Sequence, residues 1–159
     1  MTAHRTVLVV GPTGVGKTFV ACALAHAALR HDQRALYLRV PRLLDELVLA
    51  RADGRLPRLM AAWARLDVLI LDDFGLRKLT AQQSSDFYDV LVERDKRAAT
   101  VITSNRAVDE WVALFDDPIL ANSALDRVAH RAHQIVMDGP SLRAVRAPNG
   151  PRRRGDVAR

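Results

Sequence analysis

Cysteine and long apolar runs are scarce in this chain, and each scarcity excludes a class of protein. The 159 residues contain one cysteine, so no disulfide forms within the chain, and Cys22 is expected to be a small buried core residue. The longest uncharged stretches, 6–16 and 18–29, fall short of the roughly 20 apolar residues that a membrane span needs. No signal peptide is visible before the first apolar run. We therefore expect a cytoplasmic protein that has no membrane partner.

Lysine is also rare, yet the chain is basic. Three Lys accompany 21 Arg, and the net charge is +6. Residues 141–159 hold six Arg against one Asp, and residues 30–65 hold eight Arg against four acids, whereas acids outnumber bases over 66–140. We expect the basic segment 146–159 to be a disordered tail that adds non-specific affinity for nucleic acid.

The most specific motif that the sequence contains is a phosphate loop. The G-x-x-x-x-G-K-[ST] pattern is filled by Gly11, Pro12, Thr13, Gly14, Val15, Gly16, Lys17 and Thr18. An apolar run at 7–10 precedes it and a helical pattern follows it, which is the context that this motif requires. Such a loop binds phosphates through its backbone N–H groups and the N-terminus of the next helix. Lys17 is predicted to reach the β- and γ-phosphates of ATP, and the Thr18 hydroxyl to bind Mg²⁺.

Apolar strands and helical patterns alternate along the chain. Strands are predicted at 7–10, 35–38, 67–71, 99–103 and 134–137, and helices from about 17 and over 42–52, 57–65 and 80–94. This order predicts an α/β fold with a five-stranded parallel sheet flanked by helices. Ligands are then expected at the carboxyl ends of the strands.

Polar residues follow two of the predicted strands. Asp72 and Asp73 come directly after the apolar run 68–71, beside the expected position of the loop. Asp72 is the candidate Mg²⁺ ligand, and Asp73 is the candidate general base that polarises the attacking water. Asn105, at the end of the next strand, is placed to face the γ-phosphate and position water.

Further segments occur in the order found in one known family. They are Leu-Leu-Asp-Glu-Leu at 43–47, Ala-Asp-Gly-Arg-Leu at 52–56, Leu-Ile-Leu-Asp-Asp-Phe-Gly at 69–75, Thr-Ser-Asn at 103–105, Asp-Pro-Ile-Leu at 117–120, and Leu-Asp-Arg-Val-Ala-His-Arg-Ala-His at 125–133. With the phosphate loop, they resemble the IstB-type transposition helper ATPases, which are similar to the DnaC helicase loaders of the AAA+ superfamily. The resemblance assigns residues 1–145 to an AAA+ ATPase core of the P-loop NTPase class.

The resemblance implies an activity and roles for three more residues. It implies an oligomeric ATPase that hydrolyses ATP with Mg²⁺, assembles on duplex DNA without sequence preference, and assists an IstA-like transposase. Asn105 is then sensor one, Arg127 an arginine finger that reaches the nucleotide of a neighbouring subunit, and Arg143 sensor two. The helices at 42–65 match an insertion that faces nucleic acid. Their candidate phosphate contacts are Arg51, Arg55 and Arg58.

The chain departs from the family pattern at three places. Asp72-Asp73 replaces the usual Asp-Glu, and the segment 139–143 differs from the usual Gly-Glu-Ser-Tyr-Arg. Because the chain starts at the first strand, we expect the family's additional N-terminal domain to be missing. Three alternatives stay open: a nucleotide- and DNA-binding module with little hydrolysis, a DnaC-like helicase loader, and a P-loop small-molecule kinase.

Overall fold

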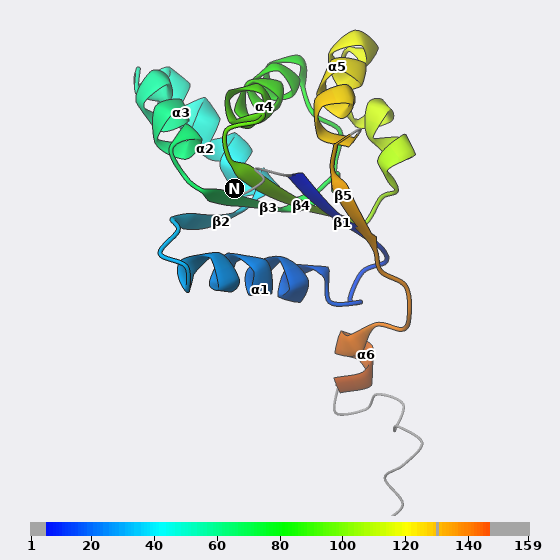
Figure 1. Ribbon diagram of the computed structural model, residues 1–159. Helices are drawn as coiled ribbons and strands as arrows, with labels where there is room; N and C mark the ends of the chain where they lie inside the picture. The colour runs from blue at the N-terminus through cyan, green and yellow to red at the C-terminus, as the bar shows by residue number, and fades with distance from the viewer. Residues whose placement is uncertain (1–5, 130, 147–159) are drawn as a thin grey trace, which may run out of the picture.

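A five-stranded sheet with helices on both faces forms the protein, as Figure 1 shows. The computed structural model describes residues 6–129 and 131–146. The strands are β1 (Thr6–Val10), β2 (Ala35–Arg39), β3 (Val68–Phe74), β4 (Ala99–Ser104) and β5 (His133–Val136). The helices are α1 (Lys17–Leu29), α2 (Val40–Ala52), α3 (Leu56–Ala64), α4 (Ala81–Arg94), α5 (Pro118–Ala129) and α6 (Leu142–Arg146), with a 3-10 helix, η1 (Val108–Leu114), before α5. Of the predicted basic tail, all but residue 146 lies outside the described residues.

The predicted parallel sheet is confirmed. The strand order is β2-β3-β4-β1-β5, and every neighbouring pair is parallel. β3 and β4 are buried almost throughout, because helices cover both of their faces, and this explains the unbroken apolar run at the start of β3. The carboxyl ends of the strands meet at one edge of the sheet, next to the loop that joins β1 to α1.

The two faces of the sheet are covered unequally. The helix α1 alone packs on one face, whereas α2, α3, α4, α5 and η1 cover the other (Figure 1). The larger core lies under this second layer, where the ring of Phe74 stacks on that of Phe87 with centroids 4.9 Å apart. The smaller core contains Val9, Ala21 and Ile70, between α1 and the sheet.

Local signals set the ends of several elements. The predicted capping box opens α4: Thr80 Oγ1 accepts the N–H of Gln83 over 3.2 Å, and the Thr80 N–H donates to Gln83 Oε1 over 3.1 Å. Pro41 lies in the first turn of α2, where its missing N–H costs nothing, so α2 begins two residues before its predicted start. β3 runs past its predicted end and contains both Asp72 and Asp73.

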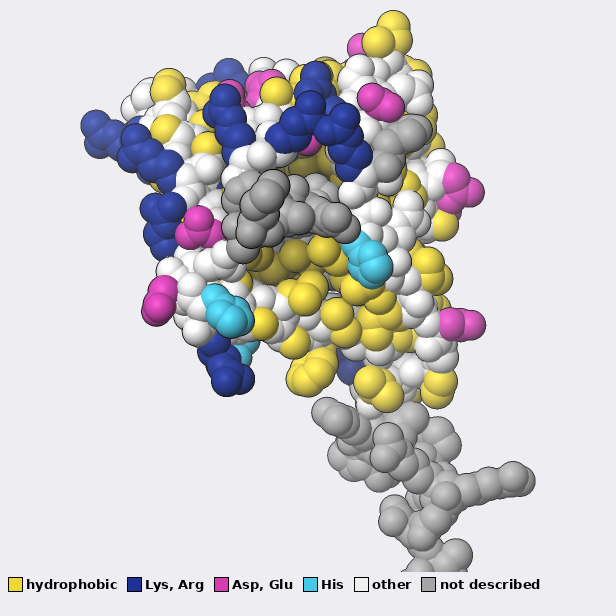
Figure 2. All heavy atoms as spheres, viewed as in Figure 1, with side chains coloured by type: hydrophobic (Ala, Val, Ile, Leu, Met, Phe, Trp, Pro, Cys, Tyr) yellow, Lys and Arg dark blue, Asp and Glu magenta, His cyan; other side chains and the backbone are white. Residues whose placement is uncertain are grey.

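The expected burial of Cys22 is wrong. The sequence of α1 is apolar on all sides, but only one side of the helix meets the sheet. Cys22 is therefore exposed, as is Phe19 with 78% of its surface accessible. Figure 2 shows hydrophobic side chains gathered in the lower part of the molecule around α1, whereas Lys and Arg gather over the helical layer above. Within the described ranges, no helix is long and apolar enough to cross a membrane.

Candidate nucleotide-binding site

The loop between β1 and α1 has a shape that requires glycine. Gly14 has a φ of 87°, and a Cβ at this position would lie 2.1 Å from Oγ of Ser141. A Cβ on Gly11 would lie 2.1 Å from the carbonyl oxygen of Met137. The chain that follows β5 therefore packs directly on the loop, and the N–H of Leu142 donates to the Gly14 carbonyl over 2.9 Å.

Lys17 is the first residue of α1 and is only 7% exposed. Its Nζ donates to the carbonyl oxygens of Gly11 and Pro12, each over 2.7 Å. Burial lowers the pKa of Lys17 below its ordinary value, although the nearby carboxylates of Asp73 and Asp72 act in the opposite direction. The ammonium group is thus held inside the loop by neutral acceptors. A charged phosphate oxygen is a stronger acceptor than these carbonyls.

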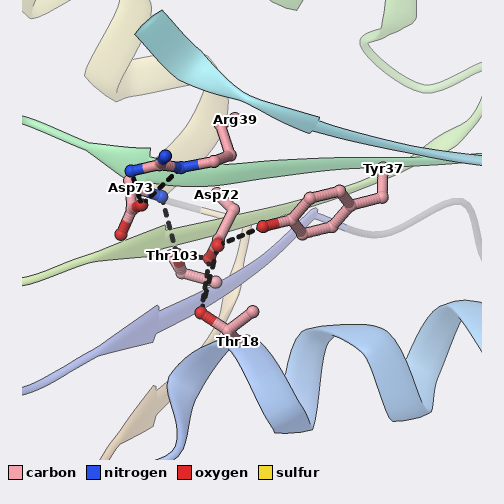
Figure 3. A network of polar contacts seen from close by, with 6 residues as sticks. All are labelled: Thr18, Tyr37, Arg39, Asp72, Asp73 and Thr103. Atoms are coloured by element: carbon pink, nitrogen blue, oxygen red, sulfur yellow. Dashed lines mark hydrogen bonds and ion pairs between the residues drawn. The ribbon is translucent and has the colours of Figure 1, made fainter. Parts of the chain in front are cut away.

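Asp72 lies on β3, facing the start of α1, and is 2% exposed. Thr18 Oγ1 donates to its two carboxylate oxygens over 3.1 and 3.0 Å. The hydroxyl of Tyr37, on β2, donates to Oδ2 over 2.6 Å, and the hydroxyl of Thr103, on β4, donates to Oδ1. Figure 3 shows the three hydroxyl groups converging on this one carboxylate. The two predicted metal ligands, Thr18 and Asp72, are therefore in contact.

Asp73 has an unusual backbone conformation. Its φ of 62° lies in the left-handed region, and the pairing of β3 with β4 is irregular between Leu71 and Phe74. The Asp73 N–H donates to Thr103 Oγ1 over 3.0 Å. Nε and one terminal nitrogen of Arg39 lie 2.9 and 2.8 Å from Asp73 Oδ2 (Figure 3). The candidate base is thus held by a cation at the end of β2.

A cavity of about 490 Å³ opens beside the loop. Residues 13–20 line one side, together with Asp73, Asn105 and Arg143. The remaining wall is formed by Met137 and Leu142. The structure therefore brings together most of the predicted nucleotide-binding residues, which come from the loop, from β3, from the end of β4 and from α6.

Arg127 does not line this cavity. It lies near the end of α5, where its guanidinium is 3.7 Å from Asp95 Oδ2 and 5.9 Å from the centre of the Tyr88 ring. With Lys96 and Arg131, it borders a separate polar cavity of about 240 Å³.

The three arginines proposed for nucleic acid differ in their contacts. Arg51, in the last turn of α2, forms an ion pair with Asp86 of α4, whose side chain is 3% exposed. Arg55 pairs with Asp53 over 2.7 Å at the surface. Arg58, on α3, is exposed and forms no ion pair within the part of the chain that the structure describes. Arg55 and Arg58 are thus presented to solvent, whereas Arg51 also links two helices.

Three residues around the acids were missed in the sequence: Tyr37, Arg39 and Thr103. Tyr37 and Arg39 are two apart on β2 and so project from the same face of the strand. The register pairs Arg39 with Asp72. In the sequence, Tyr37 and Arg39 are a pair of polar side chains two residues apart near the end of a predicted strand. They can be assigned to the acids only once it is known that β2 lies next to β3.

The fold and this site define a P-loop nucleotide-binding domain. Solved structures with the same fold include the DnaC helicase loader, with a TM-score of 0.76 and 20% identity, covering 86% of this chain and 80% of that one. DnaI gives a TM-score of 0.76 and 22% identity, covering 86% and 75%. At this level of identity, the likeness concerns the fold alone.

The chain belongs to the family of IstB-like ATP binding proteins, whose family model matches residues 1–148. A protein of Sinorhizobium fredii that is named as an insertion sequence ATP-binding protein is 45% identical over 141 residues, which are 89% of this chain and 58% of that protein. A protein of Mycobacterium tuberculosis, named as an ATP-binding protein in an insertion sequence, is 40% identical, covering 92% and 59%. The chain thus spans just over half the length of these relatives.

Proposed function

We propose that this chain is a Mg²⁺-dependent ATPase that assists a transposase. One observation carries the proposal: a complete phosphate loop with a buried lysine lies over a buried carboxylate that Thr18 contacts directly. The names of the relatives, which refer to ATP binding and insertion sequences, support the same function. The nucleotide-binding unit comprises residues 1–145, and we expect it to act in the cytoplasm on DNA.

The residues of the cavity divide the work. Residues 11–16 would surround the phosphates with backbone N–H groups, and Lys17 would neutralise charge on the terminal phosphates. Thr18 and Asp72 would hold Mg²⁺, a cation that proteins bind with few carboxylates plus substrate phosphates, and whose charge favours γ-phosphate transfer when it is bound. Asp73 would accept a proton from the attacking water, and Asn105 would orient that water. Arg143 would contact the phosphates from α6.

Phosphate release from ATP, measured with and without duplex DNA, tests this function. Asp73→Asn should keep the affinity for ATP and lose hydrolysis, because only the proton acceptor is removed. Asp72→Asn should weaken Mg²⁺-dependent binding of ATP. The control is Asp109→Asn, an exposed acid on η1, which should hydrolyse ATP like the wild type. Normal hydrolysis by both site variants would refute the assignment of the acids.

The assembly is proposed to place Arg127 at the nucleotide of a neighbouring subunit. Its separation from the loop cavity of its own chain supports action between subunits. Turnover per subunit should therefore rise with protein concentration and with DNA. An Arg127→Ala protein should bind ATP but hydrolyse it poorly, and mixing it with Lys17→Ala protein should restore activity. If the two variants assemble together without regaining activity, Arg127 is not the finger.

The subunits are proposed to assemble on duplex DNA. Arg55 and Arg58 are presented to solvent on and beside α3, and backbone phosphates are the expected contacts because exposed arginines bind them without reading sequence. Arg51 is expected to contribute less, since its guanidinium already holds Asp86.

A nucleotide switch with little turnover is the second candidate. The ion pair of Arg39 with Asp73 favours it, because the guanidinium is bound to one of the two carboxylate oxygens of the candidate base. Tight ATP binding without phosphate release, even on DNA, would support this alternative. A helicase-loading role, which the DnaC-like fold allows, predicts a complex with a replicative helicase instead of a transposase.

A further inference from the structure

The carboxylate of Asp72 is buried, and the groups that donate hydrogen bonds to it are neutral hydroxyls. It is 2% exposed, and within residues 6–129 and 131–146 it forms no ion pair with Lys or Arg. Its hydrogen-bond donors are the hydroxyls of Thr18, Thr103 and Tyr37. A buried carboxylate without a paired cation is costly unless several donors satisfy its oxygens. The three hydroxyls therefore satisfy the oxygens of Asp72 in the absence of a cation and leave the carboxylate able to receive one.

These three hydroxyls have different duties. Thr18 Oγ1 is the proposed metal ligand, so its hydroxyl would serve both the cation, through a lone pair, and Asp72, through its hydrogen. Thr103 Oγ1 also accepts the N–H of Asp73, so it serves both acids. The Tyr37 hydroxyl has the 2.6 Å bond to Asp72 Oδ2, which is a length typical of a hydroxyl on a charged acceptor. Of the three hydroxyls, that of Tyr37 is thus the one whose role in the site is limited to its hydrogen bond with Asp72.

Tyr37 reaches the site from the edge strand. Its position on β2 pairs with Ile70 of β3, two residues before Asp72, and its side chain points along the sheet toward that carboxylate (Figure 3). Tyr37 therefore links the edge strand directly to Asp72.

We propose that Tyr37 is the positioning residue of the magnesium site: its hydroxyl fixes the rotation of the Asp72 carboxylate so that one oxygen faces the Thr18 hydroxyl. The proposal rests on the proposed function, because it assumes that Thr18 and Asp72 hold Mg²⁺. Without the phenol, the carboxylate can rotate about its terminal bond, and the cation must order it on binding. Loss of an outer partner of this kind lowers metal affinity by roughly 10- to 100-fold.

The test compares two tyrosine-to-phenylalanine variants. Tyr37→Phe removes only the hydroxyl from a ring that is 39% exposed, and Thr18 and Thr103 still satisfy Asp72, so the protein should fold. Tyr88→Phe is the matched control, since the chain has two tyrosines and Tyr88 lies on α4, outside the lining of the cavity. Calorimetric titration with ATP, in EDTA and at graded Mg²⁺, reports binding without relying on turnover.

In EDTA, all three proteins should bind ATP alike, because Tyr37 does not contact the phosphate loop. The Mg²⁺ concentration that gives half of the gain in ATP affinity should rise about tenfold in Tyr37→Phe and stay unchanged in Tyr88→Phe. Paramagnetic resonance of Mn²⁺, added with a non-hydrolysable ATP analogue, should show the same loss of metal affinity. A role in packing alone would shift the unfolding midpoint and leave the Mg²⁺ midpoint where it is.

A double-variant cycle separates this inference from the function beneath it. Asp72→Asn should remove the Mg²⁺ effect, and adding Tyr37→Phe to it should change nothing further. If Asp72→Asn removes the Mg²⁺ effect while Tyr37→Phe titrates like the wild type, the positioning role is wrong and the proposed function stands. If Asp72→Asn binds Mg²⁺ and ATP normally, the metal assignment itself fails and the inference fails with it.

Discussion

Two buried charges at opposite edges of the sheet differ in what surrounds them. Arg94, at the end of α4, and Asp72, on β3, are each 2% exposed. The guanidinium of Arg94 lies at the amino ends of the strands and donates to the carbonyl oxygens of Trp63, Leu66 and Ala99 and to Thr100 Oγ1. Asp72, near the carboxyl ends, accepts bonds from three hydroxyl groups.

The comparison separates a structural charge from the proposed metal ligand. Carbonyl groups of α3, β4 and the segment between α3 and β3 cannot turn away from Arg94 unless the chain unfolds, so this residue joins those elements permanently. Hydroxyl groups rotate and both donate and accept, so those around Asp72 can reorganise when a cation arrives. No buried side-chain nitrogen or oxygen lacks a partner in the part of the chain that the structure describes. The two buried charges therefore differ in their hydrogen-bond partners: those of Arg94 are fixed, whereas those of Asp72 can rotate.

The largest expected effect is the loss of stability on replacing Arg94. Arg94→Leu should lower the free energy of unfolding by at least about 2 kcal/mol, because the carbonyl groups of Leu66 and Ala99 lose their side-chain donor and each unsatisfied group costs about 1–3 kcal/mol. The Trp63 carbonyl keeps the N–H of Leu66 as its donor. Urea denaturation measures this. The control is Arg97→Ala, one turn away at the surface, with an expected change within about 0.5 kcal/mol. If Arg94→Leu and Arg97→Ala were equally stable, Arg94 would not be a structural charge.

Lys17→Ala should give the opposite result at the other edge. Affinity for ATP should fall roughly a hundredfold, since the loop loses charged hydrogen bonds worth about 1.5–3 kcal/mol each. The free energy of unfolding should not decrease, because a buried ammonium group is removed. Titration with ATP and urea denaturation together test this, with exposed Lys96→Ala as control. Unchanged ATP affinity would refute the nucleotide site itself.

Asp86 allows a further comparison with Asp72, because it is also a buried acid but forms an ion pair with an arginine, Arg51. Arg51→Ala should lower the free energy of unfolding by about 1–2 kcal/mol, a value reduced by the half-exposed position of Arg51. Arg58→Ala, on the neighbouring helix, should change stability by less than about 0.5 kcal/mol. If Arg51→Ala and Arg58→Ala are equally stable, the ion pair between Arg51 and Asp86 does not stabilise the fold.

The smallest effect concerns DNA. The affinity for duplex DNA should fall steeply with salt, and the double variant Arg55→Ala, Arg58→Ala should reduce the slope of log K against log salt by up to about 2, since each phosphate contact contributes about 0.9. Fluorescence anisotropy at several salt concentrations measures the slope. A slope that stays at the wild-type value would remove both residues from the interface.

The elements of the fold were largely predictable because their signals are local. An unbroken apolar run predicted the buried strand β3, and Thr80 with Gln83 predicted the start of α4. Cys22 shows the limit of this reasoning. A residue in an apolar helix is buried only where something packs on that side of the helix, and the sequence of α1 does not say which sides are covered.

Sequence alone determined the phosphate loop and the acids of β3, since both are runs of adjacent residues whose chemistry does not depend on distant partners. Tertiary structure decided which group holds each acid: Tyr37 and Arg39 lie 35 and 34 residues from their carboxylates. It also decided that Arg51 holds Asp86 and that Arg127 lies away from the loop. The physical reason is that a hydrogen bond is sensitive to an ångström or less, and the register between strands that sets such a distance comes from the packing of the whole sheet.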